Sequence, residues 1–375
     1  FVNMAGFFLA SHVKPVRDAI EEHRRRLDQC PLTEVDEKRR DYELQLRQAL
    51  VEYFGGHSDD YALTGSTTMG LGTVYCGLKL RPGQEILTSE HDHYSTHRSL
   101  EFASARTGIP VRKIALFQNS ATATAPQIVE AVERGIRPNT RILALTWVHS
   151  STGMKLPIGQ ISEVVRRANS QRAEQHRVIF CVDGVHGFGV ENTTIEQLGC
   201  DFFMAGCHKW ILGPRGTGLI FAKPDAWAVT QPTIPSFEGI WRNDARALPS
   251  AEMTPGGFHA FEHFWALESA FRLHLAMGKG AVQERIHSMN HAIKQELAKM
   301  PHVKLYTPQS NDLSAGIVCF DVNGMKQVEV VERLKQAKVL ASQTPYKVSY
   351  ARVSASLLNN EADVERTVGA IRALA

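Results

Sequence analysis

Short apolar runs alternate with amphipathic segments up to about residue 225. The runs have the length of buried strands and read, in order, "EILTSE" (85–90), "RILALTWVH" (141–149), "RVIFCVD" (177–183), "DFFMAGC" (201–207) and "GTGLIFAK" (216–223). Helix-period segments lie between several of them, for example "IGQISEVVRRANSQ" after residue 157. Strands that are apolar on both faces and separated by helices are typical of a mostly parallel sheet. The pattern therefore predicts an α/β fold.

The pattern changes after about residue 255. Two long helical periods, at about 258–278 and 280–299, precede shorter strands and helices, including "AGIVCFDV" and "YKVSYARVSA". We therefore predict a large domain over residues 21–255 and a smaller C-terminal α+β domain over residues 256–375. Residues 1–20 are expected to pack on the small domain. The charged segment 13–54 is expected to be helical, packing on one domain or on a partner subunit.

Composition and charge exclude several classes of protein. The chain has 375 residues, of which 43% are hydrophobic and 22% charged, as in ordinary globular proteins. The net charge of +3 is too small to indicate a nucleic-acid partner or a membrane surface, and no apolar run is long enough to span a bilayer. We expect neither partner. The six cysteines form no CxxC pair, which favours buried free thiols over disulfides or a zinc site.

Polar stretches follow the apolar runs, at the strand ends where open α/β sheets bind ligands. In "TGSTTMG" (64–70), backbone N–H groups of Ser66 and Thr67 at a helix start could hold a phosphate; a plain capped helix start is the alternative. In "EHDHYSTH" (90–97), His93 and His97 have the i, i+4 spacing of zinc ligands. No H-E-x-x-H follows, so we favour a ring that stacks on a flat cofactor over solvated histidines, and both over a metal.

Two further strand ends deliver an acid and a lysine. The run "FCVDGVHGFG" places Asp183 at the end of an apolar strand, where a buried carboxylate needs a cationic partner, such as a protonated ring nitrogen, unless it only caps a turn. The stretch "GCHKWILGPRGTG" places Lys209 at the end of another. A lysine there does not fit a solvated surface but fits an imine-forming residue. A phosphate cup, a stacking ring, an acid and an imine lysine together predict pyridoxal 5′-phosphate.

The sequence resembles the class V aminotransferases, a family of fold-type I pyridoxal phosphate enzymes that includes cysteine desulfurases and isopenicillin N epimerase-like proteins. The likeness runs from "FVNMAG" to "YARVSASLLNNEADVERTV". Its most specific part is "HKWILGPRGTG", in which a tryptophan at position 210 resembles the pattern of the epimerase-like branch. The resemblance implies a seven-stranded type of sheet in the large domain, a smaller C-terminal domain and a homodimer.

The resemblance also implies a role for each matching residue. These are Lys209 (imine with the cofactor), Asp183 (pyridinium nitrogen), His93 (ring stacking), His186 and Ser150 (phenolic oxygen), Ser66, Thr67 and His208 (phosphate), Thr254 (phosphate across a dimer interface), Arg352 (substrate carboxylate) and Asn3 (border of the substrate site). Two departures affect the phosphate site. Gly206 and Cys207 stand where desulfurases often have a serine before His-Lys, and Met253 replaces the usual glycine before Thr254.

Arg352 lies in a mostly apolar strand pattern, where its charge must be paired. A bidentate hold on an α-carboxylate suits its planar guanidinium. A salt bridge to an acidic residue of the small domain is the alternative.

The expected activity is aminotransferase-type chemistry on an amino acid or a peptidyl amino acid. An epimerase or a β-elimination lyase of the same family is the alternative. A desulfurase is disfavoured because "KVLASQTPYKVSYARVS" contains no cysteine. The alternatives outside the family are a non-catalytic binding protein and a zinc hydrolase. Residues 3–31 are similar to exported, twin-arginine-signal members, one of which tailors a siderophore side chain. We therefore expect siderophore tailoring in the periplasm, with the cytoplasm as the alternative location.

Overall fold

A seven-stranded sheet forms the centre of the large domain in the computed structural model, which describes residues 1–238 and 248–375. Its strands are β2 (Tyr61–Thr64), β3 (Glu85–Ser89), β4 (Val111–Ile114), β5 (Thr140–Thr146), β6 (Ile179–Asp183), β7 (Phe202–Gly206) and β8 (Gly218–Ala222). They lie in the order β2-β8-β7-β6-β5-β3-β4. All pairings are parallel except those of β8, which is antiparallel to both neighbours. The prediction of a mostly parallel sheet is confirmed.

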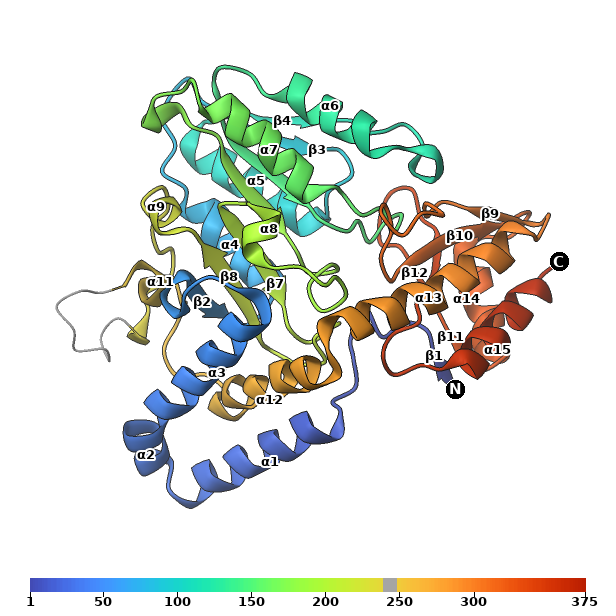
Figure 1. Ribbon diagram of the computed structural model, residues 1–375, viewed down its shortest axis with the longest axis horizontal. Helices are drawn as coiled ribbons and strands as arrows, with labels where there is room; N and C mark the ends of the chain where they lie inside the picture. The colour runs from blue at the N-terminus through green and yellow to red at the C-terminus, as the bar shows by residue number, and fades with distance from the viewer. Residues whose placement is uncertain (239–247) are drawn as a thin grey trace.

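Helices cover both faces of this sheet (Figure 1). They are α4 (Thr67–Gly77), α5 (Tyr94–Thr107), α6 (Ala125–Gly135), α7 (Ile158–Asn169), α8 (Ile195–Leu198), α9 (Pro224–Trp227) and α11 (Pro249–Glu252). Side chains alternate between two apolar clusters along each strand. Leu143 and Leu145 pack with α6, α7 and α8, whereas Ile142 and Ala144 pack with α4, α5 and α9. Burial on both faces explains why the strands read as continuous apolar runs.

Helices precede the sheet, and the two long ones pack with a helix that follows it. The helices before the sheet are α1 (Lys14–Gln29), α2 (Pro31–Thr33), the π-helical turn η1 (Glu34–Lys38) and α3 (Arg39–Phe54), and the later helix is α12 (Phe261–Met277). Short 3₁₀ turns occur at η2 (Ser58–Asp60), η3 (Ser120–Thr122) and η4 (Glu174–His176). Helix α12 contacts α1 and α3, and its Leu267 and Phe271 belong to the core cluster that contains Phe203 of the sheet. The predicted boundary at residue 256 is therefore wrong, because α12 packs with the large domain.

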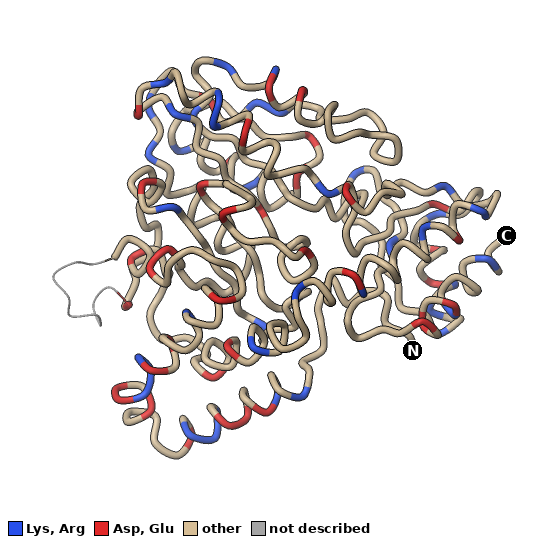
Figure 2. Tube along the Cα trace, in the orientation of Figure 1, with Lys and Arg blue, Asp and Glu red and all other residues tan. Residues whose placement is uncertain are grey.

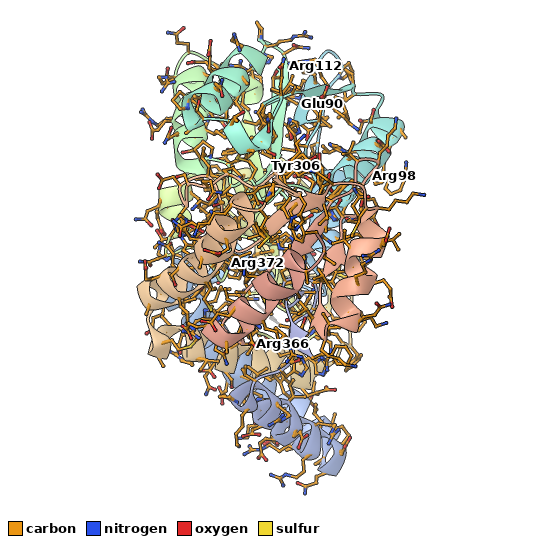
Figure 3. All side chains as sticks on the ribbon, turned by 90° about the vertical axis from the view of Figure 1, so that its right-hand side faces the viewer. Glu90, Arg98, Arg112, Tyr306, Arg366 and Arg372 are labelled. Carbon is orange, nitrogen blue, oxygen red and sulfur yellow. The ribbon has the colours of Figure 1, made fainter. Side chains whose placement is uncertain are left out.

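The small domain carries a four-stranded antiparallel sheet and a separate strand pair. Its elements are α13 (Lys279–Ala298), β9 (Val303–Leu305), β10 (Val318–Val322), α14 (Gln327–Gln336), β11 (Val339–Leu340), β12 (Ser342–Gln343), β13 (Ala351–Val353) and α15 (Glu361–Arg372), and β11 pairs with β1 (Val2–Asn3). Figure 3 shows α15, which carries the labelled Arg366 and Arg372, in front of the large domain. Only the first residues of the predicted segment 1–20 join this domain, because α1 packs on α12.

Charged side chains of both signs are interspersed along the chain (Figure 2). Helix α1, for example, carries four arginines and four acidic residues. Among the described residues, no helix combines the length and the apolar character needed to cross a membrane. Mixed charge of this kind gives no large electrostatic field for a polyanionic partner.

A buried ion pair joins α3 to the segment that precedes α11. Arg47 donates to a carboxylate oxygen of Glu238 at 3.1 Å, and both side chains are buried. Arg47 also donates to the carbonyl oxygens of Ser58 and Tyr61, at the start of β2. The guanidinium therefore fixes the edge strand of the large sheet to α3.

Replacing Arg47 by methionine should lower the free energy of unfolding by about 3–5 kcal/mol, because the Glu238 carboxylate stays buried without its cation. Urea unfolding followed by circular dichroism measures this loss. The double variant Arg47→Met/Glu238→Leu should recover much of it, since neither charge remains. Arg98→Met, in the exposed pair with Glu101, is the matched control and should change stability little. A double variant no more stable than Arg47→Met would contradict the account.

Candidate active site

The carboxyl ends of β5, β6 and β7 meet at one edge of the sheet. Thr146 pairs with Asp183, and Asp183 pairs with Met204. A cleft opens at this edge, with polar side chains converging on it. It is lined by Ser66, Thr67, Thr68, Leu71, His93, Ser95, Thr146, Ser150, Asp183, Val185, His186, His208 and Lys209. The structure thus brings together eight of the nine residues that the resemblance assigns to the cofactor; Thr254 is the exception.

Lys209 reaches the cleft from the loop that follows β7. Its Nζ lies 3.3 Å from His186 Nε2, and burial lowers the pKa of the amine. Burial also raises the pKa of the nearby Asp183 carboxyl, which accepts a hydrogen bond from the backbone N–H of Val185 at 3.3 Å. Each charged form is disfavoured by desolvation and favoured by the other. A neutral amine is the nucleophilic form of lysine, so the site suits imine formation with a carbonyl.

The start of α4 forms the other end of the cleft. Ser66 caps the helix by accepting the Met69 N–H at 3.1 Å, and Thr67 Oγ1 accepts the Gly206 N–H at 2.8 Å. A Cβ atom on Gly206 would lie 3.0 Å from that hydroxyl, so the close approach favours glycine there. His208 Nδ1 is buried and has no hydrogen-bond partner among the described residues. A helix N-terminus beside an unpartnered ring nitrogen fits a phosphate group.

His93 stands at the side of the cleft as the N-cap of α5. Its Nδ1 accepts the Ser95 N–H at 3.2 Å. Burial, with the nearby charges of Lys209 and Arg352, lowers the pKa of His93 to about 4. The ring is therefore neutral at physiological pH and presents an uncharged flat surface to the cleft.

The other histidines of "HDHYSTH" point to separate partners. His91 stacks on Phe117 at 4.0 Å between ring centroids, and its Nε2 accepts the Leu116 N–H. His97 Nε2 lies 2.8 Å from the carbonyl oxygen of Ser89. In residues 1–238 and 248–375, no three histidine, cysteine or acidic side chains converge as metal ligands. The geometry gives the zinc-hydrolase alternative no support.

Arg352 lies on β13 and reaches toward the cleft from the small domain. It donates to Ser342 Oγ at 3.1 Å, to the Ser150 carbonyl at 2.9 Å and to the Gln343 carbonyl at 3.0 Å. None of these acceptors is a carboxylate, so the structure does not support the salt-bridge alternative. A guanidinium has five N–H donors, so each terminal nitrogen keeps one N–H for a further acceptor. That arrangement suits a bidentate hold on a substrate carboxylate.

Two expected site residues are engaged elsewhere. Thr254 is buried, accepts the Leu63 N–H at 3.1 Å and donates to the Ser250 carbonyl. These bonds are made within the chain, and the expected phosphate contact of Thr254 across a dimer interface stays a prediction. Asn3 lies in β1, where its side chain accepts the Ala5 N–H at 3.0 Å, and it does not line the cleft.

Tyr346 is a site residue that the sequence motifs do not indicate. It lies in the loop between β12 and β13, and its hydroxyl is 2.7 Å from Ser150 Oγ. Its ring stands edge-on to His93 at 6.1 Å, and burial raises the pKa of the phenol to about 12. The run "YKVSYARVSA" predicts a strand through this position, but β13 begins only at Ala351. Because its pKa is raised, the Tyr346 hydroxyl is neutral, and its contact with Ser150 places it beside the cleft.

Comparison with known proteins identifies the family. Residues 37–367 match the model of the aminotransferase class-V family. The chain belongs to this family. It is 26% identical over 347 residues to an isopenicillin N epimerase of Streptomyces clavuligerus, covering 88% of this chain and 84% of the relative. It is 23% identical to a probable cysteine desulfurase of Vibrio cholerae, covering 87% and 80%. The relatives therefore include the epimerase-like branch that Trp210 indicates.

Solved structures show the same fold. A variant of C-DES with glycine linked covalently to its pyridoxal phosphate cofactor aligns with a TM-score of 0.88, 20% identity and coverage of 99% of this chain and 96% of that chain. The complex of the cystine C–S lyase C-DES with cysteine persulfide aligns equally well, at 21% identity. The class V chain described here is a fold-type I enzyme, and its cofactor is pyridoxal phosphate.

The residues of the cleft fit this cofactor. The start of α4 and the unpartnered His208 nitrogen suit its phosphate, and the flat neutral His93 suits its ring. Imine formation would remove the charge of the lysine that stabilises the buried Asp183 carboxylate. The carboxylate would then need another cation, and a protonated pyridine nitrogen would supply one. Lys209 and His186 stand within reach of one another at the remaining side.

Asp183→Asn should lower turnover by about 100-fold or more, because it removes the charge that stabilises a protonated cofactor ring while keeping the shape of the side chain. Bound pyridoxal phosphate, measured by absorbance after release in alkali, should fall much less. Asp201→Asn is the matched control: Asp201 lies beside the opposite end of β7 and pairs with Lys223. Near-normal turnover in Asp183→Asn would contradict the assigned role.

Proposed function

We propose that the chain is an aminotransferase acting at the Cα of an amino acid or a peptidyl amino acid. One observation carries the proposal. The Lys209 amine is buried, has a lowered pKa and lies beside both the Asp183 carboxylate and His186. Such an amine can take a proton from one carbon and return it to another near neutral pH.

The cleft residues divide this task. Bound pyridoxal phosphate supplies an electron sink that acidifies the substrate Cα–H bond. Asp183 would hold the positive charge of the ring nitrogen, and the neutral His93 would pack on the ring without competing for that charge. The Lys209 amine, with its lowered pKa, would carry the proton. Arg352 orients the substrate through its two remaining N–H groups.

Persulfide chemistry is disfavoured by the surroundings of the cysteines. Cys319 is buried in β10, and burial raises the pKa of its thiol to about 12. The loop before Arg352 carries Tyr346 beside the cleft and contains no cysteine. A thiol with a raised pKa is a poor nucleophile. The chain therefore lacks a reactive thiol at the site, although several relatives are named cysteine desulfurases.

Epimerisation is the second candidate, and Tyr346 favours it. Inversion at Cα requires a proton to leave on one face and return on the other. Lys209 supplies one proton-transferring group, and the Tyr346 hydroxyl, hydrogen-bonded to Ser150, is a second group beside the cleft. The 26% and 25% identical isopenicillin N epimerases support this alternative.

The substrate and the setting are also proposals. An amino acid bound through its carboxylate fits Arg352, and a siderophore peptide as substrate in the periplasm is supported only by the likeness of residues 3–31 to exported members. A homodimer is supported by the family resemblance, which also implies that Thr254 contacts the phosphate across the interface. A panel of amino acids and glutamyl peptides distinguishes these substrates.

A single-turnover reaction tests the reaction class. Holoenzyme mixed with a substrate from the panel, without a keto acid acceptor, should yield one keto product per site and permanent loss of the visible cofactor band. Mass spectrometry of the product and chiral chromatography measure the outcome. Recovery of the opposite enantiomer with no keto product would contradict the aminotransferase proposal and identify the reaction as epimerisation. Release of sulfur from cysteine as the main reaction would overturn both.

Arg352→Lys should raise KM for an amino acid roughly tenfold or more, because lysine cannot make the bidentate contact. The matching decarboxylated amine should be affected little. Steady-state kinetics on both substrates makes the comparison. Arg333→Lys, in the exposed pair with Glu329 on α14, is the control. An equal rise in KM for the amino acid and for the amine would mean that Arg352 acts only through its contacts with Ser150, Ser342 and Gln343.

A further inference from the structure

His186 lies between two nitrogen atoms at the floor of the cleft. Trp210 Nε1 is 3.2 Å from His186 Nδ1, and Lys209 Nζ is 3.3 Å from His186 Nε2. The side chains of His186 and Trp210 are buried, and Lys209 is half-buried at the cleft. Each ring nitrogen of His186 therefore faces one partner.

An indole N–H only donates hydrogen bonds, so Nδ1 of His186 must be the acceptor. A neutral imidazole carries one proton, which then has to lie on Nε2. We propose that Trp210 is a positioning residue that fixes His186 in its Nε2–H tautomer. His186 can then only donate on the side that faces Lys209 and the cofactor. It donates to the free amine of Lys209, or to an oxygen of the bound cofactor.

The surroundings exclude the doubly protonated ring. A proton on Nδ1 would face the indole N–H, and no acceptor would lie between them. The charged and titratable groups around His186 are Lys209, Arg352, His93 and His208, and all four lower its pKa, as burial does. Geometry and charge thus agree that the ring is neutral.

The indole is held so that it cannot turn away. A Cβ atom on Gly316 of the small domain would lie 2.3 Å from the Trp210 ring, and one on Gly189 would lie 2.9 Å from Trp210 Cβ. The loop itself is closed by a hydrogen bond from the Leu212 N–H to the Lys209 carbonyl at 3.1 Å, with Leu212 at φ 59°. A non-glycine residue with positive φ persists only where its surroundings enforce it. The donor is therefore pre-oriented by the fold.

Loss of this donor should be visible in the cofactor spectrum. In Trp210→Phe, His186 is free to move its proton to Nδ1, and the cofactor oxygen loses a hydrogen-bond donor. The anionic oxygen left when the cofactor linkage loses its proton is then less stabilised. The pH midpoint of the visible absorbance band of the holoenzyme should rise by about one unit, a tenfold change in proton affinity.

Matched controls separate this effect from loss of a buried ring. Trp227 and Trp265 are also buried, but their Nε1 atoms have no hydrogen-bond partner among the described residues. Trp227→Phe and Trp265→Phe should leave the midpoint unchanged. His186→Phe should raise the midpoint at least as much as Trp210→Phe, and the double variant should shift it no further than His186→Phe alone. Additive shifts, or an unshifted Trp210→Phe, would overturn the proposal.

A second substitution covers the case in which Trp210→Phe does not fold. Site-specific incorporation of β-(3-benzothienyl)alanine at position 210 replaces the N–H by sulfur and keeps the shape of the ring. The midpoint should rise as for phenylalanine, and an unchanged midpoint would again overturn the proposal. The readout is the spectrum of bound cofactor rather than turnover. A failed aminotransferase assay and a failed tautomer test are therefore distinguishable.

Discussion

The burial of the Lys209 amine beside the Asp183 carboxylate is the constraint on which the rest of the site depends. Both groups lose hydration at the carboxyl edge of the sheet, which disfavours their charged forms, and each charge stabilises the other. A pair of this kind is poorly satisfied alone, because imine formation removes the charge of the lysine and leaves the carboxylate. A cofactor that brings its own ring cation resolves that imbalance.

The fold delivers the pair through strand order. Asp183 and Lys209 follow adjacent parallel strands, β6 and β7, so their side chains emerge at the same edge. Apolar side chains on both faces fix those strands, and the two buried clusters hold the sheet rigid beneath the cleft. The small domain adds Arg352 and Tyr346 from the other side, through contacts with Ser150. Two domains therefore share one site.

Much of this arrangement could be predicted from sequence, and the reasons for the failures are physical. Continuous apolar runs mark strands buried on both faces, so β3, β5, β6, β7 and β8 and the polar residues that follow them could be located. Strands β2 and β4 were missed because "YALT" and "VRKI" are short and lie at the edges of the sheet. Helix α12 was assigned to the wrong domain because its period shows an apolar face but not which core receives it. Tyr346 and the Trp210–His186 contact depend on residues far apart in sequence or on ring orientation, which no local pattern encodes.

Borohydride reduction of the holoenzyme, followed by peptide mapping, tests the central claim most directly. Reduction makes the bond between lysine and cofactor permanent, so the modified residue can be identified by mass spectrometry. The account predicts a pyridoxyl group on Lys209, in the peptide containing "GCHKW". A pyridoxyl group on another lysine, such as the buried Lys294 of α13, would contradict it.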